Sequence, residues 1–113
     1  SDVLPGKLSA PPHCHSAEEE IFVVLDGEGS LLLWEDGDVA EHPVWRGSVV
    51  ARPAGTGVAH AFRAGDGGLT LLMYGTRDPN DICYYPRSGK VYFVGVGVIA
   101  RLGEPLDYWD GEE

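Results

Sequence analysis

HCHSAEEEIFVVLDGEG, residues 13–29, is the stretch that decides how this sequence is interpreted. Two histidines one residue apart are followed by a short polar segment, and an apolar run then starts at Glu20. Side chains two positions apart in a β-strand point to the same face. We therefore expect His13 and His15 to share one face of a strand, with Cys14 on the other. The next strand is expected to bring Glu20 beside the two histidines.

The rest of the sequence continues this pattern of short strands. Apolar, β-branched or aromatic runs alternate with turn residues, and no stretch shows a sustained helical period. The glycines at 95 and 97 predict a close approach of another backbone, either in tight sheet packing or at a subunit interface. The length of 113 residues fits one domain, and the pattern predicts an all-β sandwich or barrel. The predicted strands span residues 3–8, 20–25, 30–34, 48–52, 59–63, 69–75, 82–85 and 90–100.

The composition disfavours two classes of partner. Eight Lys and Arg against 18 Asp and Glu give a formal net charge of −10, which repels nucleic acid and anionic membranes. No apolar run has the length of a membrane span and no secretory signal is visible, so we expect a cytoplasmic protein. Cys14 and Cys83 form no CxxC pair, and reduced thiols fit that compartment.

A third imidazole is expected from His60, far away in the sequence. It follows a bend rich in Gly and Pro in RPAGTGVAHAF, residues 52–62. With His13, His15 and Glu20 it forms a set of three imidazoles and one carboxylate. This set suits one divalent transition metal, namely Fe, Mn, Ni, Co, Cu or Zn. Four protein ligands on an octahedral ion leave two positions for substrate or dioxygen.

Other polar and aromatic residues near these positions receive different interpretations. His42 precedes a proline in a polar connection and has no paired histidine, so it is left out of the site. Glu18 and Glu19 are expected in a solvated loop. Phe22 and Phe62 share a face with the candidate ligands, so they either line an apolar pocket or fill the core.

The candidate ligands resemble the two sequence motifs of the cupin superfamily. The first, G-x(5–6)-H-x-H-x(3–4)-E-x(6)-G, falls within residues 6–29, and the second, G-x(5)-P-x-G-x(2)-H-x(3)-N, within residues 47–64. The second departs from the pattern twice, since the gap before its histidine is two residues longer and Ala64 occupies the Asn position. The matching residues are Gly6, His13, His15, Glu20, Gly27, Gly47, Pro53, Gly55 and His60.

This resemblance implies a double-stranded β-helix, a jelly-roll-like barrel with the metal inside. The segments PAGTGVAH and YYPRSGK look like those of small single-domain bacterial cupins. The whole chain, residues 1–113, is then one cupin domain, with C-terminal strands and an acidic tail over residues 76–113. The resemblance also implies a homodimer. In the tail, Tyr108 and Trp109 suggest that this segment docks on another surface.

Three functions are compatible with such a site. The first is a metal-dependent, dioxygenase-like enzyme that oxidises a small, largely uncharged organic molecule. The second is an isomerase or epimerase in which a carboxylate or tyrosine moves a proton. The third is a non-enzymatic module that binds or senses a small molecule. No Lys or Arg is expected to face inward, which disfavours a strongly anionic substrate. Tyr74, Tyr84 and Tyr85 are either proton donors at the mouth or packing residues.

Overall fold

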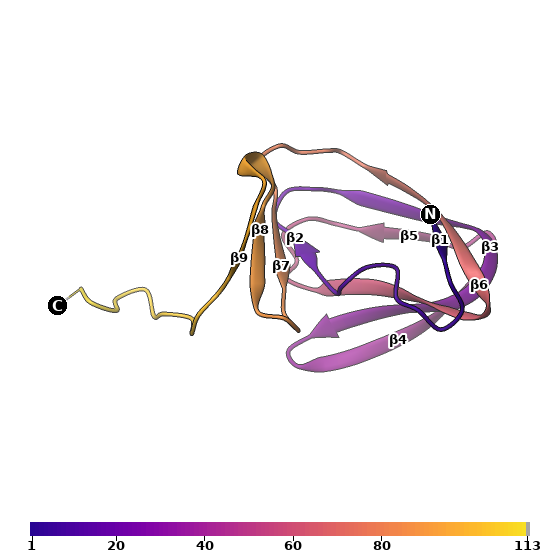
Figure 1. Cartoon of the computed structure of the whole chain (residues 1–113), viewed down its shortest axis with the longest axis horizontal. Coiled ribbons are helices and arrows are strands. Elements are labelled where there is room, and N and C mark those ends of the chain that lie inside the picture. Colours follow the sequence, from indigo (N-terminus) through magenta and orange to yellow (C-terminus); the bar gives the residue numbers. More distant parts are fainter. Residues whose placement is uncertain (113) are drawn as a thin grey trace.

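Two antiparallel sheets make up the structure, a computed structural model that describes residues 1–112. The larger sheet has the strand order β1-β6-β3-β4, and β5 also pairs with β3. The smaller sheet has the order β2-β7-β8-β9. Figure 1 shows β7, β8 and β9 standing beside the larger sheet, with the last residues of the chain running away from both. The prediction of an all-β fold is confirmed.

The strands differ greatly in length. Two long strands dominate the larger sheet and cross it side by side, whereas the strands of the smaller sheet are short. The elements are β1 Asp2–Val3, β2 Cys14–His15, β3 Glu20–Glu35, β4 Asp38–Trp45, β5 Val49–Arg52, β6 Ala59–Gly75, β7 Ile82–Tyr85, β8 Lys90–Phe93, the 3-10 helix η1 Val94–Val96, and β9 Val98–Arg101.

The two long strands each join two strands that the sequence predicts separately. In β3, the pairing with β6 shifts register between Val24 and Asp26 and again between Gly27 and Gly29. Glycine is required here because a Cβ on Gly27 would lie 2.2 Å from the carbonyl oxygen of Gly68. The glycines that suggest strand ends are therefore bulges inside continuous, bent strands.

Two further strand predictions are wrong, and one strand was not predicted. Residues 90–100 do not form one strand, because η1 and a left-handed Gly97 (φ 68°) turn the chain back so that β8 pairs with β9. The predicted strand 3–8 ends after Val3 because a turn follows, closed by the hydrogen bond from Lys7 N to Leu4 O. Strand β4 was not predicted, since seven of its eight residues are exposed and only Val44 is buried.

The apolar core lies on the inner face of the larger sheet. Phe22 and Phe62 belong to it, with their ring centroids 4.9 Å apart. The remaining buried members are Val3, Val24, Leu31, Val44, Ala64, Leu69 and Leu71. The polar residues at the starts of β3 and β6 therefore lie next to this core. No helix within residues 1–112 is long and apolar enough to cross a membrane.

Candidate metal centre

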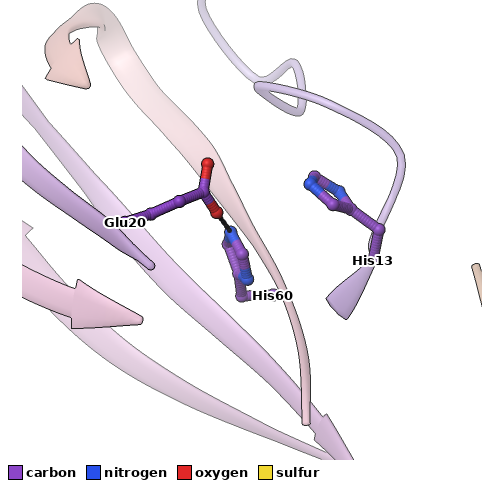
Figure 2. A group of neighbouring side chains, drawn as sticks. All are labelled: His13, Glu20 and His60. Carbon is purple, nitrogen blue, oxygen red and sulfur yellow. Dashed lines mark ion pairs between the residues drawn. The ribbon is translucent and has the colours of Figure 1, made fainter. Parts of the chain in front are cut away.

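The structure brings His13, Glu20 and His60 together from three separate segments. Glu20 is the first residue of β3, and His60 is the second residue of β6. His13 reaches the site because its backbone pairs with that of His60 in an isolated β-bridge. Figure 2 shows the carboxylate of Glu20 and the two imidazoles converging on one region. One candidate ligand atom from each residue lies within 4.8 Å of the other two.

His15 completes the predicted set from the neighbouring strand β2. Its Nε2 lies 3.0 Å from Glu20 Oε1, and His60 Nε2 lies 3.4 Å from the same oxygen. The His13 and His15 ring centroids are 4.8 Å apart. His15 therefore lies against the same carboxylate oxygen as His60, although its ligand atoms group with those of Asp81 and Cys83. Glu20 and His60 are buried, and the other two residues are half-buried.

Two potential ligand atoms at this point lie close together as an ion pair. His15 Nε2 and Glu20 Oε1 are buried and 3.0 Å apart, and within the described part of the chain neither makes a hydrogen bond of good geometry. Charge therefore holds the pair together while His15 is protonated. A cation between the imidazoles and the carboxylate satisfies both atoms at once, so the residues present fit a transition-metal ion.

The outer nitrogens of two histidines are held by the surrounding protein. His13 Nδ1 lies 2.7 Å from Pro11 O, and His15 Nδ1 lies 2.6 Å from Asp81 Oδ2. In each pair the Nδ1–H donates to the oxygen, which leaves the Nε2 lone pair directed into the site. Such outer contacts orient metal-binding histidines and increase their basicity.

Asp81 is the residue that sequence reasoning missed. Its side chain is 4% exposed and accepts hydrogen bonds from His15 Nδ1 and from the backbone N–H groups of Ala17 and Glu18, at 2.9 and 3.1 Å. It lies in the connection just before β7, and the pairing of β7 with β2 brings it to His15. Only the position of an aspartate directly before a predicted strand hinted at this role.

The electrostatics of the metal-free site follow from these contacts. Burial alone would lower the pKa of His15, but the carboxylates of Glu20 and Asp81 outweigh it and raise that pKa to about 9. Burial would raise the pKa of Glu20, but His15 and His60 lower it to about 2. The site therefore holds a carboxylate and a cationic imidazole at neutral pH, and metal binding must release a proton.

Cys83 belongs to a second group of potential metal ligands, together with His15 and Asp81. Its Sγ is 3.4 Å from His15 Nδ1 and 3.5 Å from Asp81 Oδ2. Burial, with the charge of Asp81, raises the pKa of its thiol to about 12. Cys14 lies opposite Tyr84 in the β2–β7 pairing, and both cysteines are free thiols.

A cavity of about 470 Å³ opens beside the candidate ligands. Its volume is in the range of sites for small organic molecules. Besides His13, His15 and Glu20, it is lined by Glu18, Met73, Arg77, Asp78, Pro79, Asp81, Cys83, Tyr85, Tyr92 and Val94. Of the three tyrosines predicted at the mouth, only Tyr85 lines this cavity, whereas the side chains of Tyr74 and Tyr84 are exposed away from it.

The structure decides between the alternatives left open for Phe22 and Phe62. Both belong to the apolar core rather than to the cavity lining, and the Phe22 ring packs against His60. The expectation for Glu18 is wrong, since its carboxylate accepts the backbone N–H groups of Arg77 and Asp78 at 2.8 and 2.6 Å. Glu19 is exposed in the loop as expected, and its carboxylate accepts the backbone N–H of Ala54 at 2.6 Å.

The expectation that no Lys or Arg faces inward is also contradicted. Arg77 lines the cavity, and Arg52 lies directly opposite Glu20 in the pairing of β5 with β3. The Nε atom of Arg52 is buried, and the charge of Glu20 acts on its guanidinium. The argument against an anionic substrate therefore fails. His42 lies in the exposed strand β4, outside the site.

Comparison with known proteins agrees with the geometry. The family model "Cupin domain" matches residues 1–74. A candidate sugar phosphate isomerase from Acidithiobacillus ferrooxidans has a similar structure, with 32% identity and a TM-score of 0.73 over 88% of this chain and 61% of its own. A sugar phosphate isomerase of the cupin superfamily from Silicibacter pomeroyi has 31% identity and a TM-score of 0.75 over 95% of this chain and 68% of its own.

Hazelnut vicilin, at 22% identity and a TM-score of 0.60, shares the fold. No curated protein matches the sequence significantly. This chain spans only about three fifths of the Acidithiobacillus protein and two thirds of the Silicibacter protein. The family match, the jelly-roll arrangement of two antiparallel sheets and the likeness to both isomerases together show that the chain belongs to the cupin family.

Proposed function

We propose that His13, His15, Glu20 and His60 hold one divalent transition metal. The observation that carries this proposal is the convergence of these side chains: ligand atoms of His13, Glu20 and His60 lie within 4.8 Å of one another, and His15 Nε2 lies 3.0 Å from Glu20 Oε1. When bound, such an ion supplies Lewis acidity that polarises a carbonyl or hydroxyl oxygen of a substrate.

Metal content tests this ligand set. Protein purified without added metal or a His tag is compared with His60→Ala and with the matched control His42→Ala, whose histidine lies outside the site. We expect near-stoichiometric metal in the parent and in His42→Ala, and a large loss in His60→Ala. Equal metal content in both variants, or no uptake by the reconstituted parent, refutes the ligand set.

The reaction that we propose is isomerisation or epimerisation of a hydroxy-carbonyl compound of the sugar phosphate type. Two observations support it over the oxidation expected from the sequence. Two related structures above 30% identity carry the name of sugar phosphate isomerase. The cavity beside the ligands also contains side chains that hold and transfer protons, including Tyr85 and Asp78.

The two proton-transfer residues have separate roles in this proposal. Burial raises the pKa of Tyr85, so its hydroxyl stays protonated at neutral pH and acts as a proton donor. The carboxylate of Glu18 is occupied by two backbone N–H groups, whereas Asp78 uses only Oδ1, on the backbone N–H of Asn80. Asp78 is therefore the freer base for removing a proton from the carbon next to the carbonyl.

Proton exchange with solvent tests this reaction. The metal-loaded protein is incubated with a panel of pentose and hexose phosphates in deuterium oxide, without oxygen, and carbon-bound deuterium is followed by NMR. We expect incorporation next to the carbonyl with the parent, and at least a tenfold slower rate with Asp78→Asn or Tyr85→Phe. Turnover that requires dioxygen and consumes it contradicts isomerisation and assigns oxygenase chemistry instead.

We also propose that residues 1–113 act as one domain. The support is that β2, within the family match, pairs with β7, which lies beyond it, and that Asp81 binds His15 across this junction. A chain ending at residue 76 is then expected to lose stoichiometric metal binding. Metal binding by that shortened chain equal to the parent's contradicts the one-domain proposal.

A homodimer is the assembly that we propose. The outer face of the larger sheet carries exposed apolar side chains in adjacent strands, among them Ile21, Val49, Leu72 and Tyr74. In a sheet with one solvated face these outward positions are normally polar. Sedimentation analysis is expected to show a dimer for the parent and a monomer for Leu72→Lys. A monomeric parent at micromolar concentration overturns this proposal.

A further inference from the structure

A second cavity, of about 430 Å³, shares no lining residue with the cavity already described. One wall is the N-terminal segment that precedes His13 and includes Leu8, Pro11 and Pro12. The facing wall is the turn that joins β7 to β8, and it contributes Arg87, Ser88 and Lys90. Within residues 1–112, no acidic side chain lines this cavity.

The basic character of this cavity is unusual in this chain. Acidic residues outnumber basic ones by 18 to 8, yet two of the eight basic residues line this one cavity. A third, Arg101, lies opposite Lys90 in the β8–β9 pairing, and its Nη1 is 3.4 Å from Ser88 O. A chain with net charge −10 repels anions, so an anion binds only where positive charge is concentrated locally.

The cavity beside the candidate metal ligands has the opposite character. Its lining includes the carboxylates of Glu18, Glu20, Asp78 and Asp81, and Arg77 is the one guanidinium among its lining residues. A phosphate placed among those carboxylates meets like charge, even when a metal ion neutralises part of it. The anionic end of a substrate is therefore better accommodated in the basic cavity than beside the metal.

The rings of Tyr85 and His13 lie close to lining residues of each cavity. Lys90 Nζ lies 5.0 Å from the centroid of the Tyr85 ring, and the Tyr85 and His13 ring centroids are 5.5 Å apart. Tyr85 and His13 line the metal-side cavity, while Lys90 and Pro11 line the basic one. The carbonyl of Pro11 also accepts the hydrogen bond from His13. A molecule with its two ends in the two cavities would therefore extend past the Tyr85 and His13 rings.

The turn that carries the basic residues is fixed by backbone hydrogen bonds. Gly89 has φ 64° and donates its N–H to Tyr85 O at 2.9 Å, and Gly89 O accepts Leu102 N at 2.8 Å. A side chain at a left-handed position is disfavoured, which explains the glycine in this turn. The backbone that carries these donors is therefore fixed before a ligand arrives, which reduces the ordering cost of binding.

We propose that Arg87, Ser88 and Lys90 bind the phosphate group of the substrate, whose carbonyl end lies at the metal ligands; this rests on the isomerase function proposed above. The guanidinium of Arg87 offers paired N–H donors that match two phosphate oxygens. Lys90 adds a compact charge with three donors, and the Ser88 hydroxyl adds a neutral donor.

Binding of inorganic phosphate to the metal-free full chain tests the site separately from catalysis. Phosphate is titrated by calorimetry and by NMR shifts of the 85–90 turn, for the parent, Arg87→Gln, Lys90→Gln and the control Arg46→Gln. Arg46 is an exposed arginine in the turn between β4 and β5. We expect at least a tenfold loss of phosphate affinity for the first two variants, with unchanged metal content. Equal affinities in all four proteins overturn the site.

Metal loading distinguishes a sugar phosphate from a free phosphate as the ligand of this cavity. A pentose phosphate and inorganic phosphate are titrated into metal-loaded and metal-free parent, and into His60→Ala. We expect metal to tighten binding of the pentose phosphate at least fivefold and to leave inorganic phosphate unchanged. If metal changes neither, the cavity binds a free anion and the substrate assignment is wrong. Failure of deuterium exchange alongside intact metal-dependent binding would refute isomerisation while supporting the phosphate site.

Discussion

Replacing Asp81 with asparagine is expected to weaken metal binding without removing a ligand. The carboxylate of Asp81 is 4% exposed and lies 2.6 Å from His15 Nδ1, while His15 Nε2 faces Glu20. Asparagine keeps the shape and an accepting oxygen but removes the negative charge that makes His15 a stronger donor. Changes of this kind typically cost 10- to 100-fold in metal affinity. That corresponds to about 1.4–2.7 kcal/mol, at about 1.4 kcal/mol for each tenfold.

The assay is competition of the protein with a chelator for Co²⁺ or Zn²⁺, followed by absorbance. Asp66→Asn provides a matched control, because Asp66 is exposed in the β6 strand and lacks contact with the site. The Co²⁺ spectrum gives an independent measurement, since a change in His15 orientation alters the ligand field while the ligand number stays the same. Metal affinities for Asp81→Asn and Asp66→Asn within twofold of the parent, with unchanged spectra, refute the orienting role of Asp81.

Three further predictions concern the frame around the site. Gly29→Ala is expected to lower the free energy of unfolding in urea by about 1–3 kcal/mol or more, because its Cβ would lie 2.1 Å from a backbone carbonyl oxygen. The control Gly67→Ala, with open space around it, should change stability little. A thiol reagent should label Cys14 in the native protein and spare Cys83, whose pKa is raised to about 12 and which is 5% exposed; equal labelling rates contradict the burial of Cys83. The metal-free protein should lose stability as pH rises from 6.5 to about 9. The folded-state pKa of His15 is raised, so its contribution to stability is complete only below the pKa of His15 in the unfolded chain. A His15→Gln variant with the same dependence of melting temperature on pH contradicts this.

The sequence indicated that His13, Glu20 and His60 lie close together, and the structure places them so. The apolar face of the strand that begins at Glu20 fixes which face Glu20 occupies. His60 was harder, since its approach depends on a bend, but the apolar run after it sets its orientation. His13 lies outside the regular strands, and its isolated bridge to His60 brings it to the site.

The predictions failed where an irregular connection decides the geometry. Asp81 and Arg77 lie in the loop between β6 and β7, where side chains have no fixed period and the partners are backbone N–H groups. Glu18 looked solvated for the same reason. Strand β4 was missed because an exposed edge strand carries no apolar alternation, and residues 90–100 were misread because valine and glycine also fit a tight turn between strands.

The candidate metal donors and the other candidate functional residues lie in different parts of the chain. All four candidate metal donors lie within residues 1–74, the segment that the cupin family model matches. The group that orients His15 and the groups that we propose to transfer protons and bind phosphate all follow that segment, namely Asp81, Tyr85, Arg87 and Lys90. Since the donor set alone is compatible with many reactions, we expect the sequence of the β7–β8 hairpin to determine the choice of substrate. Transplanting that hairpin should therefore change substrate preference more than metal affinity, provided that an aspartate still reaches His15.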